Sequence, residues 1–498
     1  MTTSALAAHA QARELRLPPL KLLIDGDWRD AVSGATFATI DPATEQVIAE
    51  IPEPGEQDVD HAVMAARRAF DEGPWPAMRA AERSRVLRRL AGLLERHHDE
   101  IVEIESLDAG KPLAAVRRQD FPAVLDCLEY YAGWCDKITG DVVPVRPTAL
   151  TYVVRAPVGV VAGIVPWNFP LMNAMWKIAP ALACGCTMVL KPAAETPLSA
   201  LFLGELALEA GIPNGVLNVL PGPGPTAGSA LVSHPRIDKI TFTGSPGVGK
   251  LIMERAAQHV PKITLELGGK SPNIVFADAD LDAAIKAATA GVFFNAGQVC
   301  SAGTRLLVED AVYEEVAERL IERAGSLKVG DPRQEDTYVG PLISERQLSR
   351  VLGYVERGVA EGANLETGGS RLDCPGYFVP PTVFTDVDNS MVIAREEIFG
   401  PVVSLIRFDG EDEAVRIAND SPYSLAAGLW TVDVRRAHAV AHRLRAGMVW
   451  VNTYGQTDTR LPWGGLGGDS GVGRDLGETA LENYTDRRAI WVNLRSPR

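Results

Sequence analysis

The pattern of hydrophobic and polar positions changes once along the chain. From about residue 80 to 135, apolar residues recur at spacings of three and four with charges between them, which predicts amphipathic helices with a solvated, basic outer face. After residue 150, short β-rich runs alternate with helical runs. This alternation is typical of βαβ units, so the sequence predicts a parallel sheet covered by helices that binds its ligand at the carboxyl ends of the strands.

Two blocks of alternating elements follow residue 150. In the first block, strands are expected at 158–165, 187–191, 216–220, 239–242 and 262–267, and helices at 171–183, 198–210, 226–233 and 249–257. The second block runs from about Asn273 to Leu466 and opens with a strand at 273–277 and a helix capped near Asp280. Alternating patterns at 148–158 and 489–494 predict edge strands that another surface, such as a second subunit, must cover.

Length and composition narrow the class of protein. A chain of 498 residues, 46% of them hydrophobic, exceeds one ordinary core and favours two to four domains. The 64 acidic residues outnumber the 49 Lys and Arg residues, and the net charge of −15 makes nucleic acid an unexpected partner. Six cysteines without paired spacing favour a reducing, cytoplasmic compartment. With no long apolar run and no secretion signal, we expect no membrane span, and a loose tail over roughly the first twenty residues.

A glycine-rich segment, FTGSPGVGK at 242–250, lies where a predicted strand turns into a helix. Glycines at such a turn let a phosphate approach the helix N-terminus. The segment matches most of a P-loop, but Leu251 stands where a P-loop needs a Ser or Thr hydroxyl for magnesium. Three interpretations stay open at this point: a nucleotide-binding hydrolase that uses the 244–250 turn, a nucleotide held in another geometry, and a turn without a ligand.

Cys300 lies among small and polar residues, directly after a predicted helix. By itself this thiol fits a nucleophile, a metal ligand or a packing residue. Cys184 and Cys186 have no accompanying ligands at zinc-binding spacing, so we expect packing there and no metal site. The eight histidines are scattered, and none accompanies Cys300 in the sequence.

Six motifs then decide between these interpretations. They are PWNFP at 166–170, Lys191-Pro192, the FTGSPGVG turn, LELGGK at 265–270, the GQVC loop and EEIFGP at 396–401. In this order, and from about Leu23 to Asn493, the chain resembles the aldehyde dehydrogenase superfamily. The resemblance implies an α/β fold with a Rossmann-like parallel-sheet cofactor domain at 20–139 and 157–267, a second α/β catalytic domain at 268–466, and a small β oligomerisation element at 140–156 and 485–498. It also implies a homodimer or homotetramer.

The resemblance implies oxidation of a small-molecule aldehyde to the acid with NAD or NADP. Cys300 corresponds to the nucleophile, and Glu266 to the base for the thiol and for the hydrolytic water. The side-chain amide of Asn168 and the backbone N–H of Cys300 correspond to the oxyanion donors. Lys177 and Asp475 correspond to a proton-release path. Because acylating members that use coenzyme A need no hydrolytic carboxylate, Glu266 favours a free acid product.

Similarity also assigns the cofactor contacts. They are Val165, Pro166, Trp167, Lys191, Ala194, Glu195, Gly224, Gly244, Ser245, Gly249, Leu267, Glu397 and Phe399. Many members that prefer NAD carry a glutamate three residues after the lysine, where it repels a 2′-phosphate. This chain has Ala194 there and Glu195 one place later, so NADP is expected to be tolerated or preferred.

Four aromatic residues are expected to line the substrate tunnel: Phe169, Trp176, Tyr454 and Trp463. Such walls suit aryl or alkyl aldehydes by burial, or a trimethylammonium aldehyde by cation–π attraction. The segment after WNFP has no arginine, so succinic semialdehyde lacks its usual anchor. Core packing explains any single aromatic equally well, and a catalytically idle structural protein is the remaining alternative.

Overall fold

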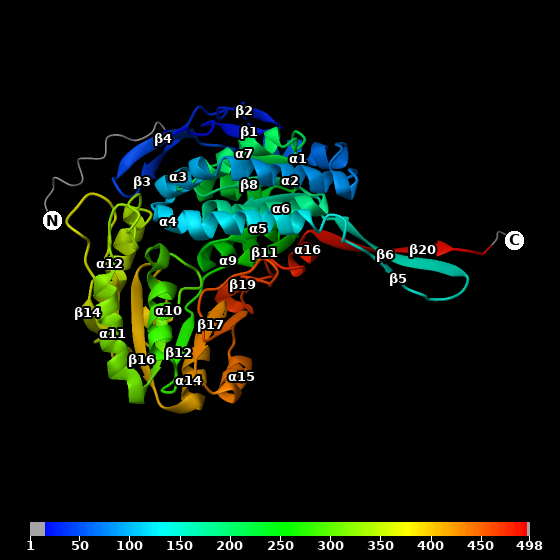
Figure 1. Cartoon of the computed structure of the whole chain (residues 1–498). Helices are drawn as coiled ribbons and strands as arrows, with labels where there is room; N and C mark the ends of the chain where they lie inside the picture. Colours follow the sequence, from blue (N-terminus) through cyan, green and yellow to red (C-terminus); the bar gives the residue numbers. More distant parts are fainter. Residues whose placement is uncertain (1–14, 496–498) are drawn as a thin grey trace.

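Two predominantly parallel sheets, each packed between helices, build the body of the molecule, and a β arm projects from it (Figure 1). The structure is a computed structural model and describes residues 15–495. The predicted α/β class is confirmed. The boundaries expected for the three domains stay a prediction.

The first sheet has eight strands, of which the central five run parallel. In spatial order they are β19 (Gly471–Val472), β11 (Lys262–Glu266), β10 (Lys239–Thr243), β7 (Val160–Ile164), β8 (Thr187–Lys191), β9 (Leu217–Val219), β1 (Leu22–Ile24) and β2 (Asp27–Arg29). Every residue of β7 and β8 is buried, as parallel strands covered on both faces must be. The strands predicted from the sequence in this block are confirmed.

Separate cores cover the two faces of this sheet. Along β7, Val160 and Ala162 belong to one core while Val161 belongs to the other, because successive side chains point to opposite faces. The first core is closed by α1 (Glu56–Asp71), α8 (Ser229–Ser233) and α9 (Pro246–Ala256). The second is closed by α6 (Pro170–Cys184) and α7 (Leu198–Glu209), with α2 (Ala80–Arg96), α3 (His98–Ala109) and α5 (Phe121–Ala132) behind them. Helix α6 is thus a central element, buried at every residue except Met172.

The second sheet has seven strands, all parallel to their neighbours except β14. In spatial order they are β14 (Asn364–Thr367), β15 (Thr382–Thr385), β16 (Val402–Phe408), β13 (Arg305–Glu309), β12 (Pro272–Val275), β17 (Ala426–Trp430) and β18 (Met448–Val451). Its helices are α10 (Leu281–Phe293), α11 (Tyr313–Ser326), α12 (Glu345–Ala360), α13 (Val392–Arg395), α14 (Gly410–Asn419) and α15 (Val434–Arg443). The predicted cap of α10 is confirmed, since the Asp280 carboxylate accepts a hydrogen bond from the Ala283 N–H at 3.0 Å.

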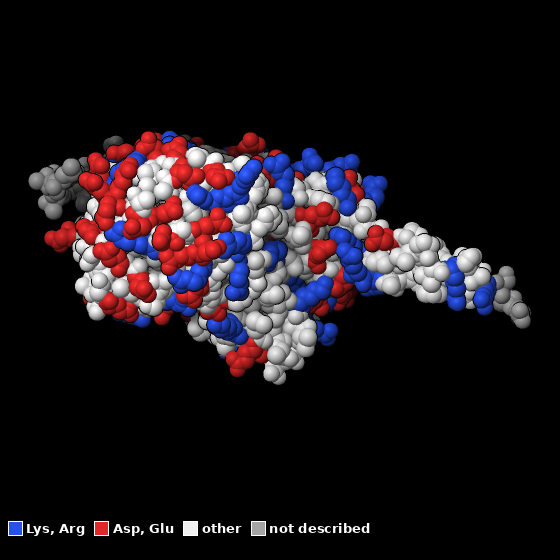
Figure 2. All heavy atoms as spheres, turned by 90° about the horizontal axis from the view of Figure 1, so that it is seen from below, with Lys and Arg blue, Asp and Glu red and all other residues white. Residues whose placement is uncertain are grey.

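The arm is a three-stranded sheet in the order β20 (Thr485–Asn493), β6 (Ala149–Pro157) and β5 (Asp141–Val142). Strands β6 and β20 pair antiparallel over nine residues, so both predicted strands are confirmed. The expectation that 148–158 forms an edge strand is wrong, because β6 lies between β20 and β5 and is paired on both sides. Most of the arm is uncharged in Figure 2, which shows the acidic and basic residues mixed over the body. Its exposed apolar residues are Val142, Val143, Val145, Leu150, Trp491, Val492 and Leu494.

Short elements complete the described chain. They are β3 (Thr36–Asp41), β4 (Gln46–Pro52), α4 (Leu113–Ala115), α16 (Thr479–Asn483), the π-helical turns η2 (Val116–Asp120) and η3 (Gly224–Gly228), and the 3-10 turns η4 (Phe294–Gly297), η5 (Asp310–Val312) and η6 (Gly468–Ser470). None of the helices within residues 15–495 has the length and apolar character needed to cross a bilayer. Over the same residues, no cluster of three or more His, Cys, Asp or Glu side chains is arranged to hold a metal ion.

Three expectations about local structure need correction. The expected loose tail is wrong for residues 15–20, because Leu15, Leu17 and Leu20 pack half-buried against the core; residues 1–14 lie outside the described part. The helix predicted from 249 begins at Pro246, since proline is preorganised for the first helical position. The helix predicted at 226–233 opens with the π-helical turn η3.

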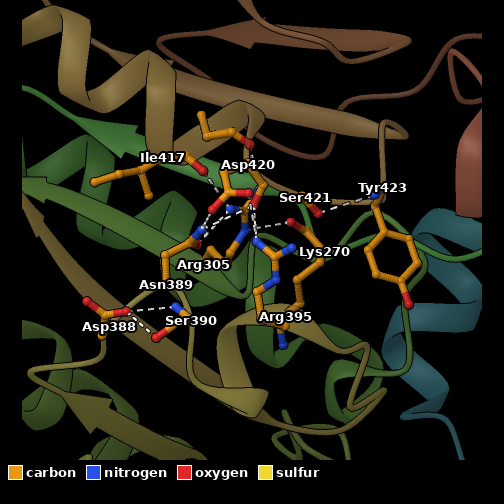
Figure 3. A network of polar contacts seen from close by, with 11 residues as sticks. Lys270, Arg305, Asp388, Asn389, Ser390, Arg395, Ile417, Asp420, Ser421 and Tyr423 are labelled. Carbon is orange, nitrogen blue, oxygen red and sulfur yellow. Dashed lines mark hydrogen bonds and ion pairs between the residues drawn. The ribbon is translucent and has the colours of Figure 1, made fainter.

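A buried arginine joins the strand after the Cys300 loop to the rest of the second unit (Figure 3). The Arg305 guanidinium donates hydrogen bonds to the carbonyls of Lys270, Ile417 and Ala418 at 2.8 to 2.9 Å, and to Asn389 Oδ1 at 3.0 Å. Burial lowers the pKa of Arg305 to about 10. These bonds anchor the end of the LELGGK segment beside the start of β13.

Candidate active site

A cleft of about 1860 Å³ takes its walls from both α/β units. The predicted residues that line it are Val165, Pro166, Trp167, Asn168, Phe169, Trp176, Lys191, Ala194, Glu195, Gly224, Gly244, Ser245, Glu266, Leu267, Cys300, Glu397, Phe399, Tyr454 and Trp463. Three predicted residues lie elsewhere. Lys177 and Asp475 are buried outside the wall, and Gly249 faces Leu267, where an added Cβ would lie 2.6 Å from a leucine methyl.

A sharp reversal of the backbone presents Cys300. Asn295, Ala296 and Gly297 have φ values of 50°, 52° and 71°, which is left-handed for three residues in succession. Such a conformation is strained for Asn and Ala and is held by the surrounding structure. A Cβ on Gly297 would lie 2.0 Å from the Gly400 carbonyl oxygen, so the GQVC loop packs directly against the EEIFGP segment.

The glycines of LELGGK allow two further close approaches. A Cβ on Gly269 would lie 2.2 Å from the Cys300 carbonyl oxygen, and one on Gly268 would lie 2.6 Å from Glu397 Oε2. The Gly269 N–H donates a hydrogen bond to Glu397 Oε1 at 3.0 Å. Three motifs that lie far apart in the sequence therefore meet at Cys300 because glycine removes the side chains between them.

Asn168 has a fixed amide orientation beside the Cys300 loop. Its side-chain Nδ2 donates a hydrogen bond to the Gln298 backbone carbonyl at 2.9 Å. The backbone carbonyl of Asn168 accepts a hydrogen bond from Asn295 Nδ2 at 3.0 Å. Within residues 15–495, the second N–H of this amide has no hydrogen-bond acceptor. This donor can stabilise negative charge that develops on an oxygen in the cleft.

Glu266 ends β11 as a buried carboxyl group. Among the described residues, no side-chain or backbone donor makes a hydrogen bond to Oε1 or Oε2. Burial raises the pKa of Glu266 well above its ordinary value, and the Asp475 charge raises it further against the opposing charges of Lys177 and Arg474. A carboxyl group whose pKa is raised is a stronger base than an ordinary carboxylate, which suits proton exchange with a thiol or a water molecule.

Lys177 and Asp475 form a buried ion pair, so the structure brings the two predicted residues together. Asp475 is fixed by its backbone, which exchanges hydrogen bonds of 2.7 and 2.8 Å with that of Trp463. The charges of both side chains influence the pKa of Glu266. This buried ion pair thus lies close enough to Glu266 to influence the pKa of its carboxyl group.

The Cys300 thiol is half-buried at the cleft wall. Burial, with the Glu397 and Glu266 carboxylates, raises the pKa of Cys300 to about 12. The thiol is therefore protonated at neutral pH in the protein alone. A nearby base has to accept its proton before it can attack a carbonyl.

The start of α9 fits the pyrophosphate of a dinucleotide. Ser245 makes no side-chain cap, the first turn has no acidic residue, and Gly244 to Val248 line the cleft. Free N–H groups at a helix N-terminus attract phosphate oxygens. Lys250 does not take part as in a P-loop, because its side chain is 65% exposed and pairs with Asp469 at 2.6 Å.

The two candidate specificity positions both lie on the cleft. Ala194 presents only a methyl group, while the Glu195 carboxylate accepts a hydrogen bond from Arg346 at 3.1 Å. Glu195 is thus already partnered by a cation. Which of the two positions governs the choice between NAD and NADP stays a prediction.

The four predicted aromatic residues are all largely buried and line the cleft. Trp176 and Trp463 meet edge to face with centroids 5.9 Å apart. Tyr454 does more than form a wall: its hydroxyl donates a hydrogen bond to the Ser301 carbonyl at 2.8 Å. Its ring fills space left by three glycines, since a Cβ on Gly291, Gly303 or Gly428 would come within 2.5 to 2.8 Å of it. Tyr454 therefore stabilises the Cys300 loop through its hydroxyl and its ring.

Sequence reasoning missed a second wall of the cleft. The π-helical turn at Val116–Asp120, with Met172 and Phe294, lines the same space. The interval 80–135 was predicted to be helical, but the chain bends at Gly110, which has φ +67°. The Gly-Lys-Pro sequence at 110–112 was the signal for this bend.

Comparison with known proteins identifies the family. The aldehyde dehydrogenase family model matches residues 28–490, so the chain belongs to this family. Retinal dehydrogenase 2 of Mus musculus is 48% identical over 482 residues, which cover 96% of this chain and 93% of the relative. An NAD+ complex of an aldehyde dehydrogenase from Bacillus cereus shares 48% identity with a TM-score of 0.94, covering 96% of this chain and 97% of that one. Indole-3-acetaldehyde dehydrogenase of P. syringae shares 44% identity with a TM-score of 0.95, covering 97% and 98%.

The protein is therefore an NAD(P)-dependent oxidoreductase that converts an aldehyde into a carboxylic acid. The resemblance seen in the motifs is confirmed. A nucleotide-binding hydrolase is not favoured, in agreement with the exposed, paired Lys250. Family membership likewise supports an enzyme over a structural protein.

The raised thiol pKa generates a pH prediction. Because the pKa of Cys300 is about 12 without cofactor, its thiolate fraction at pH 7 is small and should grow about tenfold per pH unit. We expect alkylation of Cys300 by iodoacetamide, followed by peptide mass spectrometry, to accelerate about tenfold per pH unit, or about a hundredfold between pH 7 and 9. Glu397→Gln removes a charge that raises this pKa and should speed alkylation at pH 9. A rate that levels off below pH 8 would contradict the predicted pKa.

Proposed function

We propose that Cys300, Glu266 and Asn168 carry out the oxidation through a covalent thioester. The observation that carries this proposal is the meeting of the three side chains on one cleft, with Gly269 packed against the Cys300 carbonyl. Each group has a chemical property that the reaction needs. Cys300 supplies a nucleophile, Glu266 an exchangeable proton site, and Asn168 an oriented donor.

In the proposed reaction, Cys300 gives its proton to a base and attacks the aldehyde carbon. A C–S bond forms, and the carbonyl oxygen becomes an oxyanion that accepts hydrogen bonds from the Asn168 amide and the Cys300 N–H. The nicotinamide cofactor, when bound, accepts the hydride of the aldehyde carbon. A thioester on Cys300 remains. Water then attacks it with Glu266 as the base, the C–S bond breaks, the acid leaves, and the sulfur regains a proton.

Glu266 must return its proton to solvent after each turnover. The Lys177–Asp475 ion pair lies close enough to change the pKa of Glu266, and we place the exit of the proton there. On the cofactor side, Glu397 and Phe399 would contact the nicotinamide half. Lys191 and Trp167 would contact the adenosine ribose, and the α9 N-terminus the pyrophosphate.

We propose neutral aromatic and aliphatic aldehydes as the substrate class. The wall formed by Phe169, Trp176, Phe294 and Trp463 provides aromatic surface. Relatives named for retinal and for indole-3-acetaldehyde support this class. The Trp176–Trp463 pair also favours a second candidate, an amino or betaine-type aldehyde held by cation–π attraction. A panel containing benzaldehyde, hexanal and betaine aldehyde, assayed with NAD and with NADP, separates the two classes.

We propose a cytoplasmic homodimer or homotetramer joined through the arm. Strands β6 and β20 carry exposed apolar residues, including Trp491 at 55% exposure, that a second subunit would cover. The predicted domain boundaries at 20–139 with 157–267, 268–466, and 140–156 with 485–498 belong to the same proposal.

The carboxyl of Glu266 generates a kinetic prediction. Glu266→Gln should permit hydride transfer but slow hydrolysis of the thioester, so stopped-flow absorbance should show a burst of reduced cofactor followed by slow turnover. The matched control is Cys300→Ala, which should show no burst while it still binds cofactor. Loss of cofactor binding in Glu266→Gln would make this residue structural.

The cofactor pocket generates a specificity prediction. Ala194→Glu places a carboxylate near the adenosine ribose and should shift the ratio of kcat/KM for NAD to that for NADP by at least about tenfold, or about 1.4 kcal/mol, towards NAD. Glu195→Ala is the control. If Glu195→Ala relaxes the preference while Ala194→Glu leaves it unchanged, the specificity position is one residue later than we place it.

The arm generates an assembly prediction. Wild-type protein at micromolar concentration should scatter light as a dimer or tetramer, and Trp491→Asp should shift it towards smaller species, because the carboxylate would be buried without a partner. Val432→Asp is the control, since Val432 is 72% exposed on the second α/β unit. A wild-type monomer, or equal effects of both substitutions, would count against the arm as the interface.

A further inference from the structure

We propose that Glu105 and Asp108 are positioning residues: from one face of α3, each caps a helix that begins directly after an active-site loop. Glu105 would hold the loop that carries Asn168, and Asp108 the loop that carries Ala194 and Glu195. The inference deepens the proposed function and rests on it. Neither carboxylate lines the cleft or belongs to a motif that the proposed reaction uses.

Helix α6 starts without a cap of its own. Its N-cap residue, Phe169, has no polar side chain, and Pro170 has no N–H. The first N–H of the helix therefore belongs to Leu171, and it donates a hydrogen bond to Glu105 Oε1 at 3.1 Å. Asn168 lies three residues before Leu171, so the position of the oxyanion donor depends on this bond.

Helix α7 repeats the arrangement. Pro197 is its N-cap residue and makes no side-chain cap, and the Leu198 N–H donates a hydrogen bond to Asp108 Oδ2 at 2.8 Å. The other oxygen of Asp108 accepts a hydrogen bond from the Thr39 hydroxyl at 2.7 Å. That hydroxyl also lies 3.3 Å from the Glu195 carbonyl oxygen. Asp108 is thus linked to the cofactor loop on both sides of Thr196.

The two carboxylates are three residues apart on α3, so they share one helix face. A helix N-terminus is the favoured partner for a carboxylate, since it offers free N–H groups and a positive dipole end. Three residues further on, Lys111 forms a buried ion pair with Asp120, and its ammonium lies 3.5 Å from the centroid of the Phe169 ring. Lys111 lies beyond the end of α3, after the left-handed Gly110, and this adjoining segment also supports the residue that precedes α6.

Packing alone does not explain these side chains. Glu105 and Asp108 are 2% and 1% exposed, and burial raises their pKa values to about 7 and about 8. A leucine would fill the same interior at a lower desolvation cost, whereas a carboxylate is favoured where backbone donors would otherwise be unpaired. Both carboxylates meet such a donor at the start of a helix that leads from the active site.

The test uses the full-length protein and two pairs of variants. Glu105→Ala should lower kcat for aldehyde oxidation by at least about tenfold, because a displaced oxyanion donor stabilises the transition state less. The dissociation constant for NAD should change less than about twofold. Asp108→Ala should show the opposite split, with NAD binding weakened at least about tenfold in a calorimetric titration and kcat at saturating cofactor nearly retained. Each variant is the matched control for the other, since both remove a buried carboxylate from α3.

Conservative variants separate positioning from folding. Glu105→Gln and Asp108→Asn keep an acceptor oxygen and should restore most of the lost function. Thr39→Val removes only the hydroxyl beside Asp108 and should weaken NAD binding without lowering kcat. Equal loss of kcat and NAD affinity in both alanine variants, without rescue by the amides, would overturn the proposal. If the wild-type protein did not oxidise aldehydes, or if the Cys300→Ala variant still did, the proposed function itself would be contradicted.

Discussion

Backbone packed directly against backbone, at Gly269 and Cys300, sets the geometry of the cleft. The Cys300 loop, the LELGGK segment and the EEIFGP segment come from distant parts of the sequence. Gly297 in the first and Gly268 and Gly269 in the second lie where a side chain would separate these segments. A Cβ at Gly297, Gly268 or Gly269 would lie 2.0 to 2.6 Å from an oxygen of the neighbouring segment, which is closer than van der Waals contact allows, so the segments would have to move apart. The left-handed turn at Asn295 and Ala296 is held by the hydrogen bond from Asn295 Nδ2 to the Asn168 backbone carbonyl and by the contact of Gly297 with Gly400.

Buried charges form a second layer of organisation behind the cleft. The Lys177–Asp475 pair sets the electrostatic environment of Glu266, the Lys111–Asp120 pair supports Phe169, and Arg305 binds carbonyls at the root of the Cys300 loop. Removing one member of a buried pair leaves an uncompensated charge, which typically costs about 3 to 5 kcal/mol. Such groups make the supporting structure intolerant of small shifts, and an active site needs that rigidity to keep its donors in place.

The pattern of the chain allowed the alternating strands and helices, and most of the residues that line the cleft, to be predicted, because hydrophobic periodicity and linear motifs are local. The contribution of Tyr454 to the Cys300 loop was not predictable, since it depends on three glycines from three different elements. The carboxylates of α3 were missed for a related reason: in sequence, Glu105 looks like any acidic residue on a helix. The π-helical wall at Val116–Asp120 was not predicted, because the spacing of apolar residues over 80–135 indicates helices without distinguishing a π-helical turn from an α-helix.

Strand β19 has a consequence for the order of events during synthesis. Its residues, Gly471 and Val472, pair with Glu266 and Leu265 at the edge of the first sheet, about two hundred positions earlier in the chain. Contacts of such long sequence separation form late, because the loop between them must close first. A nascent chain on the ribosome therefore carries the nucleophile and the carboxyl long before the carboxyl's strand is completed. A chain that has not yet reached Gly471 and Val472 lacks the strand that pairs with Glu266, so the surroundings of this carboxyl are incomplete until these residues are synthesised.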